Sequence, residues 1–185
     1  IEEFIEEEEL KKIDGFLNIY SNNDDSVFFL KLDKEDLNEK FIYFSYVMNA
    51  PQGSTLTGGL PSDGKVYEFR SFKKDKIGLY QINTSYIKGD ETNNIARSSI
   101  TNITEAFVEV FKPTARTEDS VLINLNSIIL SEKMDSISYV PSEYREYISV
   151  DYGRPDEAKT FVKNIYNNKT NTAFEVTFAF ENVAP

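Results

Sequence analysis

The apolar positions of this chain fall into short runs separated by polar turns, which is a pattern that predicts β-strands. Between residues 15 and 48, apolar runs at 16–20 and 27–32 flank a polar tip of Ser, Asn and Asp. Two such runs on either side of an Asn/Asp tip predict a hairpin. A third apolar run, at 41–48, is long enough to lie beside the first two. We therefore interpret residues 15–48 as the nucleus of a sheet.

The runs at 27–32 and 41–48 are apolar at consecutive positions rather than at every second position. Because neighbouring side chains of a strand point to opposite faces, such runs are typical of strands buried on both sides. We therefore expect other parts of the chain, or a partner domain, to cover both faces of the sheet.

Further along the chain, three more pairs of apolar runs predict hairpins. The pairs are 66–72 with 77–83, 107–111 with 120–125, and 160–166 with 172–180. No alternation of strands with long helical segments appears, so the sheets should be antiparallel. The sequence thus predicts a mainly β fold: antiparallel sheets built from sequential hairpins, with a few short helices.

The predicted helices are short and lie at the edges of the fold. Residues 1–14 are rich in Glu, and their apolar positions 1, 4 and 5 suit one helical face, so we expect a short acidic helix that Gly15 ends. Asp33, with Asp36 three residues later, predicts a capped turn through Leu37. Another turn of helix is expected near residue 127. A single β-rich domain over residues 15–185 should follow the N-terminal helix.

The segment 49–65 differs from the rest because it has no strand or helix pattern and holds half of the chain's glycines. It predicts a long loop, and long loops in compact domains are often functional. The pair Gly58-Gly59 lacks the lysine and spacing of a phosphate-binding loop. We therefore interpret Gly53, Gly58 and Gly59 as part of a possible contact surface.

A second candidate contact surface is a group of tyrosines close together in the sequence. Its members are Tyr139, Tyr144, Tyr147 and Tyr152, with Arg145 and Arg154 nearby. Aromatic residues and arginine are enriched at recognition surfaces. The same tyrosines can instead pack their loop onto a sheet, and the sequence favours that second interpretation.

Composition removes several classes of function. The chain has no Cys and no His, which excludes Cys–His and Ser–His–Asp catalysis and the usual zinc sites within it. Its formal net charge of −11 disfavours nucleic acid and anionic membranes as partners. No apolar segment approaches the roughly 20 residues that span a bilayer, so we expect no membrane insertion.

The order of features along the chain resembles a known family. The early markers are Gly15, Phe16, Leu17, Tyr20, the run 27–32, Leu37, Lys40 and Phe41. The later ones are the Gly-rich loop at 53–64, the runs 66–72 and 77–83, and the pair 160–165 with 172–180. In this order the chain resembles the N-terminal domain, of uncharacterised role, of large exported bacterial zinc-dependent metalloproteases of the metzincin type.

The resemblance implies a non-catalytic accessory domain that supports or covers a peptidase domain. In that family the catalytic H-E-x-x-H motif and its zinc belong to a following domain, so no catalytic, cofactor or metal residue is carried over. An extracellular, periplasmic or cell-surface location is implied. The start at Ile1 without Met and the end just after a strand are expected of a fragment of a longer protein, or of a domain with trimmed ends. The alternative is a free-standing surface module that binds glycan or peptide.

Overall fold

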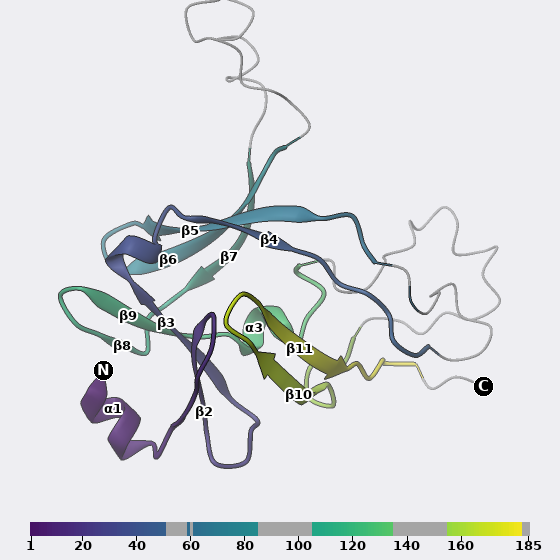
Figure 1. The fold of residues 1–185 in the computed structure, drawn as a ribbon, viewed down its shortest axis with the longest axis horizontal. Helices are drawn as coiled ribbons and strands as arrows, with labels where there is room; N and C mark the ends of the chain where they lie inside the picture. Colours follow the sequence, from purple (N-terminus) through teal and green to yellow (C-terminus); the bar gives the residue numbers. More distant parts are fainter. Residues whose placement is uncertain (51–58, 60, 85–104, 135–154, 183–185) are drawn as a thin grey trace, which may run out of the picture.

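The protein is mainly β, with antiparallel sheets and few, short helices. The computed structural model describes residues 1–50, 59, 61–84, 105–134 and 155–182. Its strands form a five-stranded sheet, a four-stranded sheet and a separate two-stranded hairpin (Figure 1).

The five-stranded sheet has the strand order β1-β2-β3-β9-β8, and every pairing in it is antiparallel. Its strands are β1 (Lys11–Ile13), β2 (Asn18–Ser21), β3 (Phe28–Asp33), β9 (Ser120–Asn124) and β8 (Ala115–Arg116). The pairing of β2 with β3 confirms the predicted first hairpin.

The four-stranded sheet runs in sequence order, β4-β5-β6-β7. Its strands are β4 (Lys40–Tyr43), β5 (Lys65–Phe72), β6 (Lys76–Ile82) and β7 (Ala106–Phe111). The remaining hairpin consists of β10 (Phe161–Asn167) and β11 (Thr172–Thr177). The predicted hairpins of β5 with β6 and of β10 with β11 are confirmed.

The core lies between the two sheets. Ile19, Phe28 and Leu30 from the five-stranded sheet pack in one buried cluster with Tyr67 and Leu79 from the four-stranded sheet. Side chains of the β10–β11 hairpin, including Val162, Ile165 and Phe174, pack partly buried against that cluster. Burial of this apolar area is the main source of stability in such a sandwich.

The outer face of the five-stranded sheet is covered by helix α1 (Glu2–Glu7). Tyr20, Phe29 and Leu122 form a second buried cluster there, against which the apolar face of α1 packs. The Phe4 and Phe29 rings meet edge to face with centroids 5.7 Å apart. β3 is thus buried on both sides, as its apolar run predicts.

The predicted N-terminal helix is shorter than residues 1–14. It ends at Glu7, and Lys11–Ile13 then pairs with β2 as strand β1. The spacing of Leu10 and Ile13 does not continue the helical face, and the free edge of β2 offers backbone hydrogen bonds instead. Gly15 therefore does not end the helix.

The predicted place of the run 41–48 beside the first hairpin is wrong. Its strand, β4, pairs with β5 in the other sheet, and β9 occupies the position beside β3. The reason lies in the turn η1 (Lys34–Asp36), where Asp33 N donates to the Asp36 carboxylate at 2.8 Å. This turn, which the sequence predicts correctly, carries the chain from one sheet to the other.

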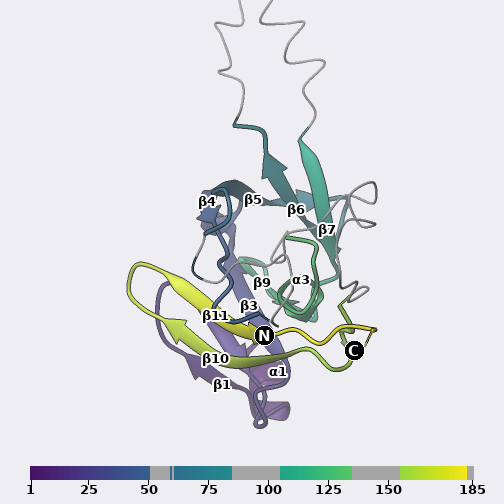
Figure 2. The same cartoon turned by 90° about the vertical axis from the view of Figure 1, so that its right-hand side faces the viewer.

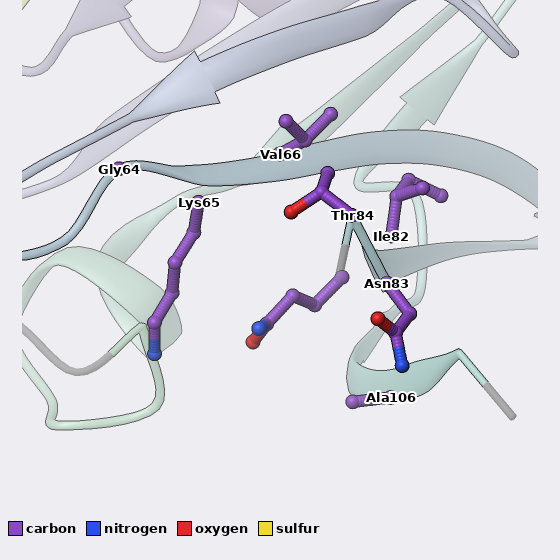
Figure 3. Close-up of a pocket in the computed structure, with 8 residues that line it drawn as sticks. Gly64, Lys65, Val66, Ile82, Asn83, Thr84 and Ala106 are labelled. Atoms are coloured by element: carbon purple, nitrogen blue, oxygen red, sulfur yellow. The ribbon is translucent and has the colours of Figure 1, made fainter. Parts of the chain in front are cut away.

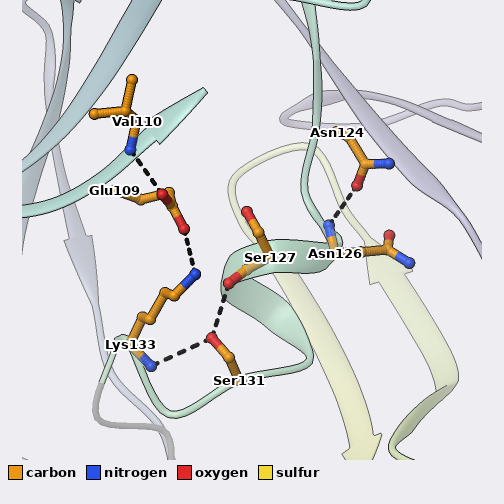
Figure 4. A network of polar contacts seen from close by, with 7 residues as sticks. All are labelled: Glu109, Val110, Asn124, Asn126, Ser127, Ser131 and Lys133. Atoms are coloured by element: carbon orange, nitrogen blue, oxygen red, sulfur yellow. Dashed lines mark hydrogen bonds and ion pairs between the residues drawn. The ribbon is translucent and has the colours of Figure 1, made fainter. Parts of the chain in front are cut away.

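The predicted hairpin of 107–111 with 120–125 is also wrong. β7 pairs with β6, whereas β9 pairs with β3 and β8. Strand β7 instead contacts the segment that follows β9 and the short helix α3 (Asn126–Ile129). The Glu109 carboxylate accepts a hydrogen bond from Lys133 Nζ at 2.5 Å, and also one from the neighbouring Val110 N at 2.8 Å (Figure 4). Helix α3 confirms the predicted helical turn in this region.

Candidate functional site

The outer face of the four-stranded sheet carries most of the exposed apolar side chains. In the described part of the chain, eight large hydrophobic residues are exposed, and five of them lie along β4, its continuation and β7. They are Ile42 (75% exposed), Phe44 (59%), Tyr46 (57%), Met48 (56%) and Phe107 (46%). No helix or strand of the described residues lies over this face (Figures 1 and 2).

Four of these residues form a regular row, which we call the apolar stripe: Ile42, Phe44, Tyr46 and Met48. Beyond β4, the chain continues as a ribbon in which Ser62 N donates to Ser45 O at 2.6 Å and Tyr46 pairs with Pro61. Because alternate residues of an extended strand share one side, Ile42, Phe44 and Tyr46 lie on the same side of the ribbon. Met48 follows them at a bend of the chain.

The stripe is continuous with apolar side chains on the neighbouring strands. Ile42 lies opposite Val66 on β5, and Val66 lies opposite Ile82 on β6. On the same face, the Tyr80 and Phe107 rings meet with centroids 4.9 Å apart, and Phe72 lies 5.1 Å from Phe107. We call this whole surface, including the stripe, the open face.

Gly78 makes room for the rings of the open face. A Cβ atom at this position would lie 2.8 Å from a Tyr80 ring atom and 2.9 Å from a Phe107 ring atom. Contacts this short do not occur at real Cβ atoms, so a side chain here would displace the rings. The glycine therefore lets both rings approach the β6 backbone closely.

A charge network stands in the middle of the open face. Arg70 Nε donates to Glu68 at 2.5 Å, and its two terminal nitrogens donate to the Glu105 carboxylate. The guanidinium also lies over the Tyr80 ring, 4.8 Å from its centroid. The hydrogen bonds that Arg70 donates to Glu105 and then to Glu68 raise its pKa, so this cation keeps its charge at every accessible pH.

A hollow of about 310 Å³ lies at the end of the same sheet, where β5, β6 and β7 meet (Figure 3). Lys65 and Asn83 extend to one side of the strands and Val66 to the other, and Thr84 adds a hydroxyl group at the rim (Figure 3). These side chains supply an ammonium group, an amide and a hydroxyl group. Such groups can hydrogen-bond a small polar ligand.

On the inner side of this sheet, Tyr67 is completely buried, and its hydroxyl has no hydrogen-bond partner among the described residues. The ring stacks on Phe41, with centroids 6.0 Å apart, and meets Tyr43 edge to face. Burial, followed by the nearby Tyr43, raises the pKa of Tyr67 to about 12. A buried hydroxyl without a partner costs stability.

We predict that Tyr67→Phe raises the free energy of unfolding by about 1 kcal/mol at pH 7, because the unpaired hydroxyl is removed. Burial favours the neutral phenol in the folded state, whereas the exposed phenol of the unfolded state ionises from about pH 10. The free energy of unfolding of the wild type should therefore fall by about 2 kcal/mol as the pH rises from 10 toward 12, and that of Tyr67→Phe should not show this loss. Urea denaturation of both proteins at pH 7 and above pH 10 measures the difference. An equal pH dependence of the two proteins would contradict the assignment.

Most of the predicted contact residues lie outside the described part of the chain. Gly53, Gly58, Tyr139, Tyr144, Tyr147 and Tyr152 are among the residues that the structure does not describe. Gly59 is described: its φ of +84° suits glycine, and its N–H donates to Val47 O at 2.7 Å. It therefore belongs to the ribbon that carries the apolar stripe.

Sequence reasoning missed the stripe itself. The signal was present, because large apolar residues occupy every second position from 42 to 48, but the odd positions are also mostly apolar. We therefore expected burial on both sides. In the structure Phe41 and Tyr43 turn inward, and the even positions remain exposed.

The described residues hold no group of three or more acidic or other metal-ligating side chains placed to bind a metal ion. In the polar tip, the Asp24 carboxylate accepts hydrogen bonds from Ser26 N and Oγ. These contacts are within the turn itself. Among the helices in the described ranges, none has the length and apolar character to cross a membrane.

Comparison with known proteins adds no relative. No family model, no curated protein and no solved structure matches the chain.

Proposed function

We propose that this chain is a non-catalytic β module that docks onto another protein domain through its open face. The single observation that carries the proposal is the apolar stripe, whose four large side chains are each more than half exposed. A more specific version of this proposal rests on the sequence resemblance. In that version the partner is the peptidase domain of an exported zinc metalloprotease.

The physical argument is the cost of leaving such a surface in water. Contiguous apolar patches on soluble proteins mark sites of interaction. Fully burying one large apolar side chain contributes roughly 1.5–3 kcal/mol, so the stripe alone can supply much of the affinity of a stable complex. Arg70 and Tyr80 belong to the residue types that most often dominate binding energy at protein interfaces.

In the metalloprotease form of the proposal, the module contributes shape and contact rather than chemistry. The zinc and the catalytic residues belong to the partner domain, and the whole protein acts outside the cytoplasm. The module covers or positions the peptidase domain.

The second candidate function is a surface module that binds a glycan or a peptide. The hollow beside Lys65 favours it, because an ammonium group, an amide and a hydroxyl group meet there. Lys65→Ala and Thr84→Ala should abolish binding on a glycan array if this function is correct. Changes in the apolar stripe should leave this binding unchanged, so the two sets of variants distinguish the two functions.

The docking proposal is tested with the domain encoded next to this segment, expressed as a separate polypeptide. Isothermal titration calorimetry should detect binding to the module. The double variant Ile42→Ser/Phe44→Ser should weaken that binding at least 100-fold, because two large apolar contacts worth roughly 1.5–3 kcal/mol each are lost. The double variant Phe161→Ser/Tyr166→Ser is the control, since it changes two large apolar side chains elsewhere that are also more than half exposed.

Equal weakening by the two double variants would contradict the assignment of the open face. A neighbouring domain without an H-E-x-x-H motif would overturn the metalloprotease form. Zinc-dependent hydrolysis of casein by the module alone would overturn its non-catalytic role.

A further inference from the structure

The β10–β11 hairpin is attached to the rest of the molecule in an unusual way. It pairs with no strand of either sheet, and it lies alongside the N-terminal strands (Figure 2). No residue of β10 or β11 is fully buried, whereas four of the six residues of β3 are. The hairpin therefore contributes little of its own surface to the core.

Within the described ranges, one side chain carries the hydrogen bonds that join β10 and β11 to the sandwich. Asn167 Nδ2 donates to Ile13 O at 2.7 Å and to Leu17 O at 2.8 Å. Its Oδ1 accepts from Leu17 N at 3.3 Å and from Thr172 Oγ1 at 2.6 Å. Asn167 thus uses both its donor and its acceptor groups to bind the segment around Gly15.

The apolar contacts of the hairpin cover a surface that would otherwise be open to water. The Phe174 ring meets the fully buried Phe28 ring edge to face, with centroids 6.3 Å apart. Ile13 and Leu17, whose backbones bind Asn167, belong to the same partly buried rim of the core. Release of the hairpin would uncover this apolar rim.

The base of the hairpin is closed by contacts within its own segment. Asp156 N donates to Ala179 O at 2.8 Å, and Ala179 N donates to Thr160 Oγ1 at 3.2 Å. The hairpin can therefore move away from the sandwich without losing its own hydrogen bonds.

From these contacts we infer that the β10–β11 hairpin is a latch that opens as one unit, with Asn167 as its fastening residue. Opening requires the loss of the Asn167 hydrogen bonds and of the partly buried apolar contacts, but, among the described strands, not of any sheet pairing. Its free energy is therefore lower than that of global unfolding, as for other cooperative substructures of folded proteins. The open form presents an apolar surface that the closed form hides. This inference does not depend on the proposed function.

Native-state hydrogen exchange of the wild-type chain tests the latch. At low denaturant concentrations, amides of residues 161–177 should exchange together, through an opening with a smaller denaturant dependence than that of β3 and β9. Exchange of the hairpin and of β3 through the same global opening would overturn the proposal.

The variant Asn167→Asp tests the fastening residue. A carboxylate cannot donate to the two carbonyl groups, so exchange in 161–177 should accelerate by roughly 30-fold or more, with β5 and β6 unchanged. Asn168→Asp, which adds the same charge at the exposed tip, is the control and should have little effect. Unchanged exchange in Asn167→Asp, or equal acceleration in every strand, would overturn the role of Asn167.

Discussion

Replacing Gly15 with alanine is expected to lower the free energy of unfolding by about 3 kcal/mol. A Cβ atom at this position would lie 2.3 Å from both the side-chain Cγ and the backbone O of Asn167. The obstacle includes backbone that the Asn167 hydrogen bonds hold in place, so it cannot rotate away. The backbone at Gly15 is not in the positive-φ region, and the loss is therefore one of space alone.

Urea denaturation measures this loss, and Gly64→Ala is the matched control. The nearest atom to a Cβ at Gly64 is Ile42 Cγ2, at an ordinary 3.9 Å. That variant should remain within about 0.5 kcal/mol of wild type. If Gly15→Ala were equally neutral, the close approach of the hairpin to the N-terminal segment would be contradicted.

Replacing Arg70 with methionine is expected to cost about 3 kcal/mol at pH 7, because it leaves a carboxylate buried without its cation. The Glu68 side chain is only 6% exposed, whereas Arg70 and Glu105 keep 29% and 28%. Most of the penalty therefore comes from Glu68. Methionine retains the apolar length of the arginine stem, so the loss of packing is small.

The double variant Glu68→Gln/Arg70→Met separates charge from packing. It removes the unpaired charge and should recover at least half of the lost stability in the same urea experiment. The exposed pair Lys34–Asp119 gives the control, because Lys34→Met there should cost less than about 0.5 kcal/mol. A double variant as unstable as Arg70→Met would show that the network acts by packing instead.

Local features of the fold could be predicted from the sequence because they depend on neighbouring residues. The alternating runs predicted the hairpins of β5 with β6 and of β10 with β11, and the Asp33–Asp36 spacing predicted the turn between the sheets. The partners of distant strands could not be predicted. β3 and β9 pair although their paired residues are about ninety positions apart in the sequence, and both strands are apolar enough to fit several neighbours.

The candidate site was predictable only in part. A contact surface near the Gly-rich loop was expected and stays a prediction. The structure shows only that Gly59 of this loop donates a hydrogen bond to Val47 O in the ribbon of the apolar stripe. The stripe was read as a buried strand, because exposure depends on whether another element covers the sheet. Helix α1 covers the five-stranded sheet, and no described element covers the other.

By itself the sequence determined the fold class, the local hairpins and the absence of His and Cys chemistry, because periodicity and composition are properties of the chain alone. The tertiary structure decided which sheet each strand joins, which apolar face remains open and why residue 15 is a glycine. Each of these depends on atoms far away in the sequence. The contact of Gly15 with Asn167 is the clearest case. The sequence predicts that Gly15 ends a helix, whereas in the structure the absence of a side chain at this position leaves room for Asn167 of a hairpin that is distant in the sequence.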